Sequence, residues 1–336
     1  MVKAMISLNS RRKDLADIRP GDTTNAGLWL DKYIQSQDRE SKASRPRLIK
    51  EVAGIREPKQ EYAAFLVRWQ RALTDIGARC RKAKALERVI VGLGSESVLE
   101  TSVTLHRTYG VPYIPGSALK GLASSYARNY LGKDWQAGSE AHGIVFGDTK
   151  AAGYLTFFDA LYLPSQTPAL HADVIAVHHE EYYRNKPVPP ADWDDPNPVP
   201  FLSTTGEYLV ALGSVPGLEE WVDRVFEVLR YALREEGVGA KTSSGYGRLE
   251  LEPPPIDYER QLADALIHDI SMFPAGKVAG EITRFVDKWR ALPVSLTHKR
   301  RVAEAIIDKN RQAGREKSVK DKDWYKEILS CKEQRQ

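Results

Sequence analysis

Apolar residues recur every three or four positions in three long stretches of the chain, which is the spacing of amphipathic helices. These predicted helices cover 61–79, 116–132 and 218–236. Shorter apolar runs lie between and after them, bounded by glycine, proline or polar residues, as is typical of strands. We expect strands within 87–94, 98–107, 153–163, 201–214 and 246–252.

Apart from an inserted hairpin and loops, the predicted elements of residues 85–252 run strand, helix, strand, strand, helix, strand. This order is that of a ferredoxin-like, RRM-type domain, so the expected class is α+β. Residues 1–84 are expected to form an N-terminal arm with a short helix in 26–34 and a longer helix packed on the core. Six prolines in 185–200 exclude a helix or a central strand there and predict a surface loop. Residues 253–336 are predicted to be a C-terminal extension of three or four helices.

The composition argues against a membrane-spanning protein and against a secreted protein held together by disulfides. No apolar run reaches the ~20 residues that a membrane-spanning helix needs, and no signal peptide is recognised at the start. The two cysteines, Cys80 and Cys331, form no CxxC pair, which fits a reducing cytoplasm. The net charge is +4, and residues 253–336 hold 17 Lys and Arg against 13 Asp and Glu. Basic clusters at 11–13, 45–50 and 79–84 suit either a polyanionic partner or a solvated surface.

The stretch GVGAKTSSGYGRLE, residues 237–250, is the strongest candidate site. It is not a Walker A loop, because Ala240 precedes Lys241 and the loop leads from a helix into a strand. Glycines with a lysine and three hydroxyls favour a cradle for a nucleic-acid backbone over a simple connector. Tyr246 is placed to stack on a base or to pack inward, and Arg248 to reach a phosphate or to anchor the sheet.

A second candidate lies at the start of the helix predicted from residue 116. Gly116 and Ser117, with Ser117 as the expected N-cap, are suited to bind an anion, because free N–H groups and the helix dipole point at it. Lys120 and Arg128 lie on one line of this helix at i and i+8. That line can follow a phosphate backbone or can simply be the solvated face of the helix.

The histidines are the candidates for catalytic or metal-binding residues. His106 beside Arg107 can act on RNA as an acid or base, although such a histidine is more often structural. His178 and His179 are adjacent and have no HxxxH or HxH spacing, so no metal site and no cofactor are predicted.

Two of these stretches together, GVPYIPGSALKGLASSYAR and GVGAKTSSGYGRLE, resemble the paired signatures of RAMP proteins from CRISPR systems. With NAGLWLDKYI, FGD, GYLTFFDA and the 178–202 stretch, the chain is most similar to the family of the sixth Cmr subunit of type III-B effector complexes. The resemblance covers roughly residues 20–252 and does not reach the C-terminal helices.

The resemblance implies a non-catalytic subunit with a single RAMP domain in a cytoplasmic ribonucleoprotein. Its partners would be crRNA, target RNA, the repeated backbone RAMP subunit and the first Cmr subunit. It would bind the 3′ part of the guide and cap the subunit stack, for antiviral defence. The residues expected to contact RNA are Gly239, Lys241, Thr242, Ser243, Gly245, Tyr246, Arg248, Gly116, Ser117, Lys120, Arg128, His106 and Arg107.

Two other functions stay open at this point. Related RAMP proteins process crRNA precursors, so the chain can be a metal-independent endoribonuclease that uses His106, His178, His179 or Lys241. Alternatively, the loops pack against neighbouring protein subunits and contact with RNA is minor.

Overall fold

The computed structural model describes residues 18–21, 23–35, 43–97, 99–177, 189, 191, 197–254 and 257–333. The chain divides into two compact units, Met1–Pro254 and Pro255–Gln336. Each unit has its own hydrophobic core.

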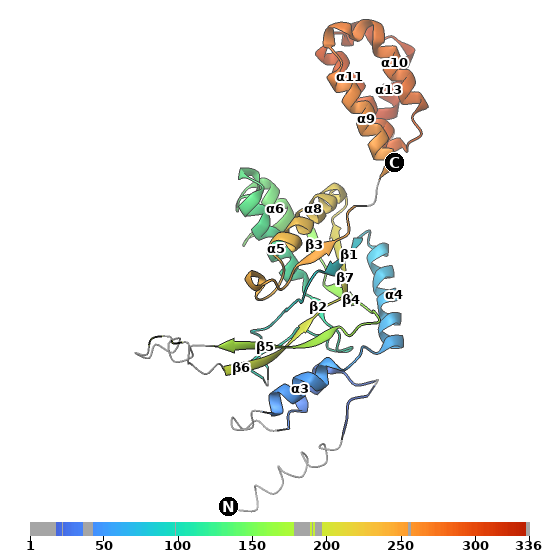
Figure 1. Cartoon of the computed structure of the whole chain (residues 1–336). Coiled ribbons are helices and arrows are strands. Elements are labelled where there is room, and N and C mark those ends of the chain that lie inside the picture. The colour runs from blue at the N-terminus through green and yellow to red at the C-terminus, as the bar shows by residue number, and fades with distance from the viewer. Residues whose placement is uncertain are drawn as a thin grey trace, which may run out of the picture. The chain divides into compact units, whose positions relative to one another are not determined.

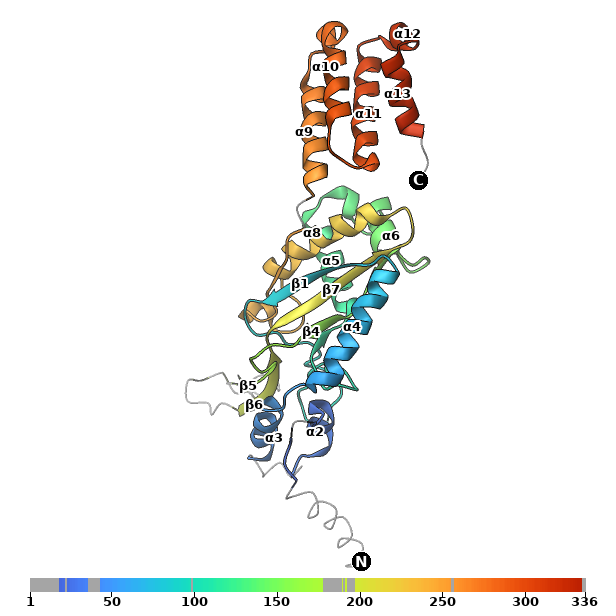
Figure 2. The ribbon, with the colours of Figure 1, turned by 90° about the vertical axis from the view of Figure 1, so that its right-hand side faces the viewer.

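The first unit is built on an antiparallel sheet. Its central strands follow the order β8-β1-β7-β4, and the intervening helices α5 and α8 complete the ferredoxin-like succession. Figure 2 shows β1, β7 and β4 side by side. The predicted α+β class and ferredoxin-like order are therefore confirmed. The elements are β1 (Arg79–Ala85), α5 (Gly116–Tyr130), β4 (Ala160–Leu163), β7 (Glu207–Ser214), α8 (Glu219–Glu235) and β8 (Leu249–Leu251).

Helices cover both faces of this sheet, as Figure 1 shows. On β7, Tyr208, Val210 and Leu212 belong to the core that α5 and α8 complete. The alternate residues Leu209 and Ala211 face helix α4 (Lys59–Asp75) and pack with its Leu73. Because successive strand residues point to opposite faces, β7 is apolar throughout. The sheet face that an RRM leaves open is thus covered over β7.

The first strand lies earlier than the sequence pattern predicts. The basic segment Arg79–Ala85 is β1, whereas the described residues of 87–94 and 98–107 form no regular strand. Arg81 is almost fully buried, with its guanidinium over the Phe226 ring and ion-paired to Asp223 and Glu227 of α8. The prediction failed because a buried arginine with partners on another element reads as polar surface in the sequence.

The predicted strand 153–163 is interrupted. It forms β3 (Leu155–Phe157) and β4, and both pair with β7. Phe157 lies opposite Leu212 and Leu161 opposite Leu209, so this side contains one extra residue, as in a β-bulge. The bulge directs Asp159 toward the start of α5. At the edge of the sheet, β2 (Tyr113–Ile114) pairs with β4.

A two-stranded ribbon of β5 (Leu170–Val177) and β6 (Asn197–Thr204) extends from the sheet, as Figure 1 shows. The prediction of a loop over all of 185–200 is wrong at its end, because Pro198 and Pro200 lie within β6. A ribbon strand has a free edge, so prolines are tolerated where their missing N–H would face away from the partner strand. The predicted strand 201–214 is in fact the end of β6, a turn and β7.

The N-terminal segment packs at the base of this ribbon. The predicted short helix is α2 (Ala26–Lys32), and a second helix, α3 (Ser44–Ala53), was not predicted. Their apolar residues form a cluster with Leu170 and Leu202 of the ribbon. A short helical segment follows α5, made of η1 (Lys133–Trp135) and α6 (Glu140–Phe146).

The second unit is a small helical bundle, with its main helices side by side in Figure 2. Its elements are α9 (Tyr258–Met272), η3 (Ala275–Lys277), α10 (Val278–Ala291), α11 (Leu296–Gln312), α12 (Glu316–Val319) and α13 (Asp323–Glu333). Its core includes Phe285, Trp289 and Tyr325. Within the described parts of both units, no helix has the length and apolarity to span a membrane.

Candidate nucleic-acid interface

The glycine-rich loop between α8 and β8 is folded tightly onto residues 88–91. Ala240 donates its N–H to the carbonyl oxygen of Ile90 at 2.8 Å, and Gly247 donates to that of Arg88 at 2.8 Å. Val238 N–H in turn reaches the Gly247 carbonyl at 2.9 Å. The loop is therefore a fixed structure rather than a flexible connector.

The glycines make this fold possible. A Cβ on Gly239 would lie 2.0 Å from the Ile90 carbonyl oxygen, and one on Gly247 would lie 2.2 Å from that of Val238. Both residues also have positive φ, which favours glycine. The expectation that these glycines admit an RNA backbone needs revision, because the chain's own backbone fills the space. Gly245 differs, since a Cβ there would meet nothing within 4 Å.

Lys241 adopts a left-handed conformation with φ of +59° and ψ of 33°, the only non-glycine residue with positive φ in the described part of the chain. The turn η2 (Thr242–Ser244) follows directly. A left-handed residue followed by a right-handed turn makes successive N–H groups converge into an anion-binding concavity. The N–H groups of Lys241, Thr242 and Ser243 donate to no acceptor in the described residues.

The side chains at this tip are available to a partner. Ser243, Ser244 and Gly245 are exposed, and Lys241 and Thr242 are half-buried. The Lys241 ammonium has no ion-pair partner among the residues that the structure describes. Glu250 of the following strand and Asp173, which lies beside Tyr246, are already paired with Arg234 and Arg88. The tip thus combines three free amides with one unpaired cation.

Tyr246 and Arg248, the other two side chains of the loop that were expected to contact RNA, turn inward. The Tyr246 hydroxyl points to Asp173 at 3.5 Å, and its ring lies 6.2 Å from that of Phe201. Burial, and secondarily the Asp173 charge, raises the pKa of Tyr246. Arg248 donates a hydrogen bond of 3.0 Å to the Arg234 carbonyl and so caps the C-terminal end of α8. Both residues support the loop instead of forming its open surface.

Asp173 on β5 joins three segments, and sequence patterns gave no sign of it. Besides Tyr246, its carboxylate accepts from Ser203 on β6 and pairs with Arg88 at 3.4 Å. Arg88 also donates to the Ser203 hydroxyl at 3.1 Å. The glycine-rich loop is thereby linked to the base of the ribbon. Only the pairing of β5 with β6 brings these residues together, which no local sequence signal reports.

The start of α5 differs from the expected anion site. The N-cap is Pro115, not Ser117, and the Gly116 N–H donates to Oδ1 of Asp159 at 2.8 Å. A Cβ on Gly116 would lie 2.1 Å from the Phe157 carbonyl oxygen. The chain's own carboxylate therefore already occupies this helix N-terminus. Ser117 is exposed, but it does not cap the helix.

The line of polar residues along α5 is interrupted. Lys120 is half-buried and Arg128 is exposed, and neither side chain has a partner in the described ranges. Between them, the Ser124 hydroxyl is hydrogen-bonded to Nε2 of His142 at 3.0 Å. Burial, and then the charge of Arg128, lowers the pKa of His142.

His106 and Arg107 lie in a turn that leads to β2. The His106 Nδ1 accepts from the Thr108 N–H at 3.3 Å, and burial lowers the pKa of the imidazole. Arg107 is exposed, and no acid in the described residues pairs with it. His178 and His179 lie outside the described residues. Among those that are described, no cluster of His, Cys, Asp or Glu could hold a metal ion.

Comparisons with known proteins show which family this fold is related to. The model of the RAMP superfamily matches residues 82–250. The CRISPR system Cmr subunit Cmr6 of Pyrococcus furiosus is 32% identical over 237 residues, which cover 53% of this chain and 69% of that protein. The Cmr6 subunit of Saccharolobus solfataricus is 26% identical over 170 residues, covering 51% of this chain and 55% of the relative.

Among solved structures, the cryo-EM structure of the Type III-B Cmr-beta bound to cognate target RNA superimposes with a TM-score of 0.50. It is 19% identical and covers 62% of this chain and 71% of the matched chain, a likeness that shows the shared fold. The family match spans the ferredoxin-like domain and its glycine-rich loop, and it ends before the helical bundle. The chain belongs to the RAMP superfamily and is a Cmr6-like member of it.

Proposed function

We propose that this chain is a non-catalytic, RNA-binding subunit of a type III-B Cmr ribonucleoprotein that acts in the cytoplasm. In this proposal the glycine-rich loop binds the backbone of crRNA near its 3′ part, and the subunit caps the stack of RAMP subunits. The observation that carries the proposal is the left-handed Lys241 with three free amides beside it. Relatives that are Cmr6 subunits, and a related fold in a complex bound to target RNA, support the assembly.

The chemistry of the tip suits a phosphodiester. Backbone N–H groups and a lysine recognise the phosphate whatever the base, which is what a guide of varying sequence requires. Thr242 and Ser243 add hydroxyl donors beside the amides. A non-glycine residue in the left-handed region costs about 1 kcal/mol, and such strained residues occur often at functional sites, which supports a role for Lys241.

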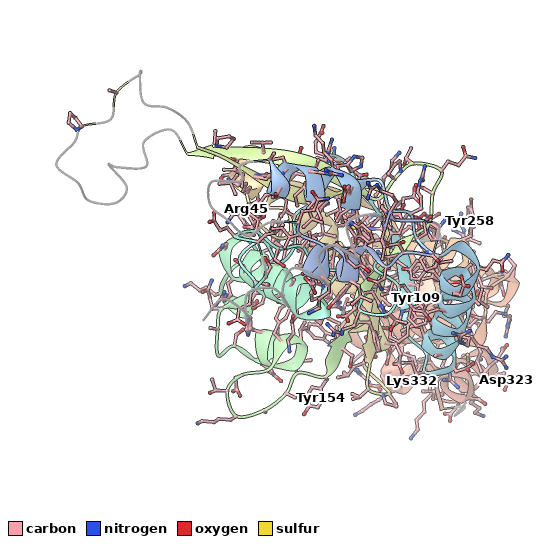
Figure 3. All side chains as sticks on the ribbon, turned by 90° about the horizontal axis from the view of Figure 1, so that it is seen from below. Arg45, Tyr109, Tyr154, Tyr258, Asp323 and Lys332 are labelled. Atoms are coloured by element: carbon pink, nitrogen blue, oxygen red, sulfur yellow. The ribbon has the colours of Figure 1, made fainter. Side chains whose placement is uncertain are left out.

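A different surface is suited to protein partners. Tyr154 and Val215 are 52% and 43% exposed, and the Val215 N–H reaches the Tyr154 carbonyl at 3.2 Å. Figure 3 labels Tyr154, next to β3. This apolar pair lies at the C-terminal end of β7, whereas the glycine-rich loop lies beyond its N-terminal end. Separate surfaces for RNA and for a neighbouring subunit fit a chain at the end of a stack.

The test is binding of the purified full chain to single-stranded RNA across salt concentrations. Lys241→Ala is expected to weaken binding and to reduce the slope of log affinity against log salt by about 0.7, the value for one phosphate contact on a single strand. Lys150→Ala, which removes an exposed lysine near β3, is the matched control and should change neither quantity.

Lys241→Gly separates binding from folding. Glycine takes positive φ without the steric cost that lysine bears, so this variant should be at least as stable as the parent chain. It should nevertheless bind RNA as weakly as Lys241→Ala. Unchanged affinity and slope in both variants would refute the proposed role of the loop.

A second candidate function, endoribonuclease activity, has one observation in its favour. Burial lowers the pKa of His106, its Nδ1 accepts a backbone N–H, and its Nε2 has no partner among the described residues. Such an imidazole can act as a general base. Incubation with repeat RNA in chelator decides between the functions. RNA that stays bound and intact supports the non-catalytic role, and cleavage that His106→Ala abolishes supports the enzyme.

A further inference from the structure

Aromatic rings from α4 and from the 106–113 turn form a continuous cluster at the β2 edge of the sheet. The ring centroids of Phe65 and Tyr109 are 4.9 Å apart, and those of Phe65 and His106 are 5.4 Å apart. His106 lies 5.0 Å from Tyr109 and 6.4 Å from Tyr113. Figure 3 labels Tyr109, beside helix α4. We call Phe65, His106, Tyr109 and Tyr113 the aromatic surface.

Phe65, Tyr109 and Tyr113 pack against the core with one side and are not enclosed by it. Tyr208 and Phe226 of the core are fully buried, whereas all four rings of the aromatic surface are half-buried. The hydroxyls of Tyr109 and Tyr113 and the Nε2 of His106 have no hydrogen-bond partner among the described residues. Amphipathic rings with free polar tips are typical of surfaces that bind planar, hydrogen-bonding partners.

The turn that carries these rings is held in place. Asn25, at the start of α2, donates to the carbonyl oxygens of Arg107 and Thr108, each at 3.0 Å. Gly110 has positive φ, and a Cβ there would lie 2.7 Å from the Ala26 nitrogen. His106 accepts the Gly110 N–H at its carbonyl, at 2.7 Å. The rings are therefore presented by a fixed backbone, which reduces the entropy lost on binding.

The charges around the aromatic surface indicate which part of an RNA it fits. Asp159 lies close enough to influence the pKa values of both His106 and Tyr113. It is exposed, and only its Oδ1 is engaged, by Gly116. A carboxylate there disfavours a phosphate but accepts hydrogen bonds from the N–H groups of a base edge. Arg68 and Arg107, both exposed and without an acid partner in the described part of the chain, lie on the same two segments as the rings.

We propose that the aromatic surface stacks an unpaired nucleobase of the bound RNA. The proposal rests on the proposed function and adds a base-contacting site to the phosphate-contacting loop. Stacking is tolerant of base identity, because every base has a π-face, and it suits a guide of varying sequence. Flanking arginines favour a nucleic acid over an apolar peptide, and peptide binding is the competing outcome.

The test compares two oligoribonucleotides of equal length, one ordinary and one in which abasic sites replace the bases. Tyr109→Leu keeps an apolar side chain and removes the ring. It should weaken binding of the ordinary oligonucleotide about 5- to 150-fold, the range for loss of one stacked base, and leave the abasic one unchanged. The salt slope should not change, because no phosphate contact is lost. Tyr258→Leu, which removes an exposed tyrosine of the helical bundle, is the control and should have no effect.

Tyr113→Leu, on β2, provides a second variant with the same expectation, so the test does not depend on one substitution folding well. Equal losses on both oligonucleotides, no loss on either, or a loss only in binding to a protein subunit would overturn the proposal. Lys241→Ala in the same assay reports on the loop alone and should weaken both oligonucleotides equally. An effect of Tyr109→Leu without an effect of Lys241→Ala would remove the proposed loop function and leave the stacking site.

Discussion

The glycine-rich loop and the start of α5 look alike in sequence and differ in the structure. Both combine glycine with serine or threonine and a lysine, in the segments GVGAKTSSG and PGSALK. In the loop, the amides of Lys241, Thr242 and Ser243 have no acceptor among the described residues. At α5, Asp159 accepts the Gly116 N–H and occupies the helix end. A site for an anion requires free donors, and a residue distant in sequence decides whether they are free.

Most glycines of these two segments lie against the chain's own backbone. Gly239, Gly247 and Gly116 all admit the chain's own backbone, because a Cβ on each would lie within 2.3 Å of a carbonyl oxygen. Gly245 alone among these four faces open space. Most glycines of both segments therefore serve folding, and the binding chemistry comes from the backbone conformation that they allow.

The largest expected effect is that of Gly239→Ala. The methyl group would collide with the Ile90 carbonyl and would face positive φ, so we expect a loss of about 3 kcal/mol in the free energy of unfolding. Gly245→Ala should lower the free energy of unfolding by only about 1 kcal/mol, because positive φ is its only unfavourable feature. Denaturant titration measures both. Equal losses would show that the loop does not depend on its contact with Ile90.

A smaller effect is expected at the start of α5. Asp159→Ala should cost about 1 kcal/mol, as the loss of a helix cap does, because it leaves the Gly116 N–H without its acceptor. Asp159→Asn keeps an acceptor oxygen and should lose less. Neither variant should reduce the salt slope of RNA binding. A reduced slope would show that this helix end binds phosphate after all.

The smallest effect concerns pH. Burial lowers the pKa values of His106, near the start of α5, and of His171, whose Nε2 is bonded to Thr205 at 2.8 Å near the ribbon base. A folded pKa below the unfolded value means that the folded state binds fewer protons, so this contribution to stability is present above about pH 6.5 and is lost as the pH falls.

The unfolding free energy should thus fall as the pH decreases through about 6.5. His106→Phe and His171→Asn should each flatten this decline. Denaturant titrations at several pH values provide the measurement, and a decline of equal steepness in both variants would contradict the assignment.

Local patterns predicted the elements that bury one face and failed where tertiary contacts dominate. The helices α4, α5 and α8 follow from apolar periodicity, and so does the ferredoxin-like order. The strand β1 was missed because Arg81 is buried only through its partners Asp223 and Glu227. Pro198 and Pro200 concealed β6, since their tolerance depends on the free edge of a ribbon.

The candidate site was predictable to a similar degree. The motif located the loop, and its helix-to-strand context excluded a nucleotide-binding P-loop. It could not reveal that Tyr246 points to Asp173, because β5 and β6 must pair before Asp173 lies beside the loop. Nor could it reveal Asp159 at the start of α5, which depends on a bulge between β3 and β4.

The central claim is that the backbone amides of Lys241, Thr242 and Ser243 hold an RNA phosphate. Amide hydrogen exchange of the full chain, measured with and without saturating single-stranded RNA, tests it directly. Without RNA these amides should exchange fast, because they lack internal acceptors. With RNA their exchange should slow, while the exposed turn around Lys150 stays unchanged. Unaltered exchange at residues 241–243 while RNA is bound would contradict the account.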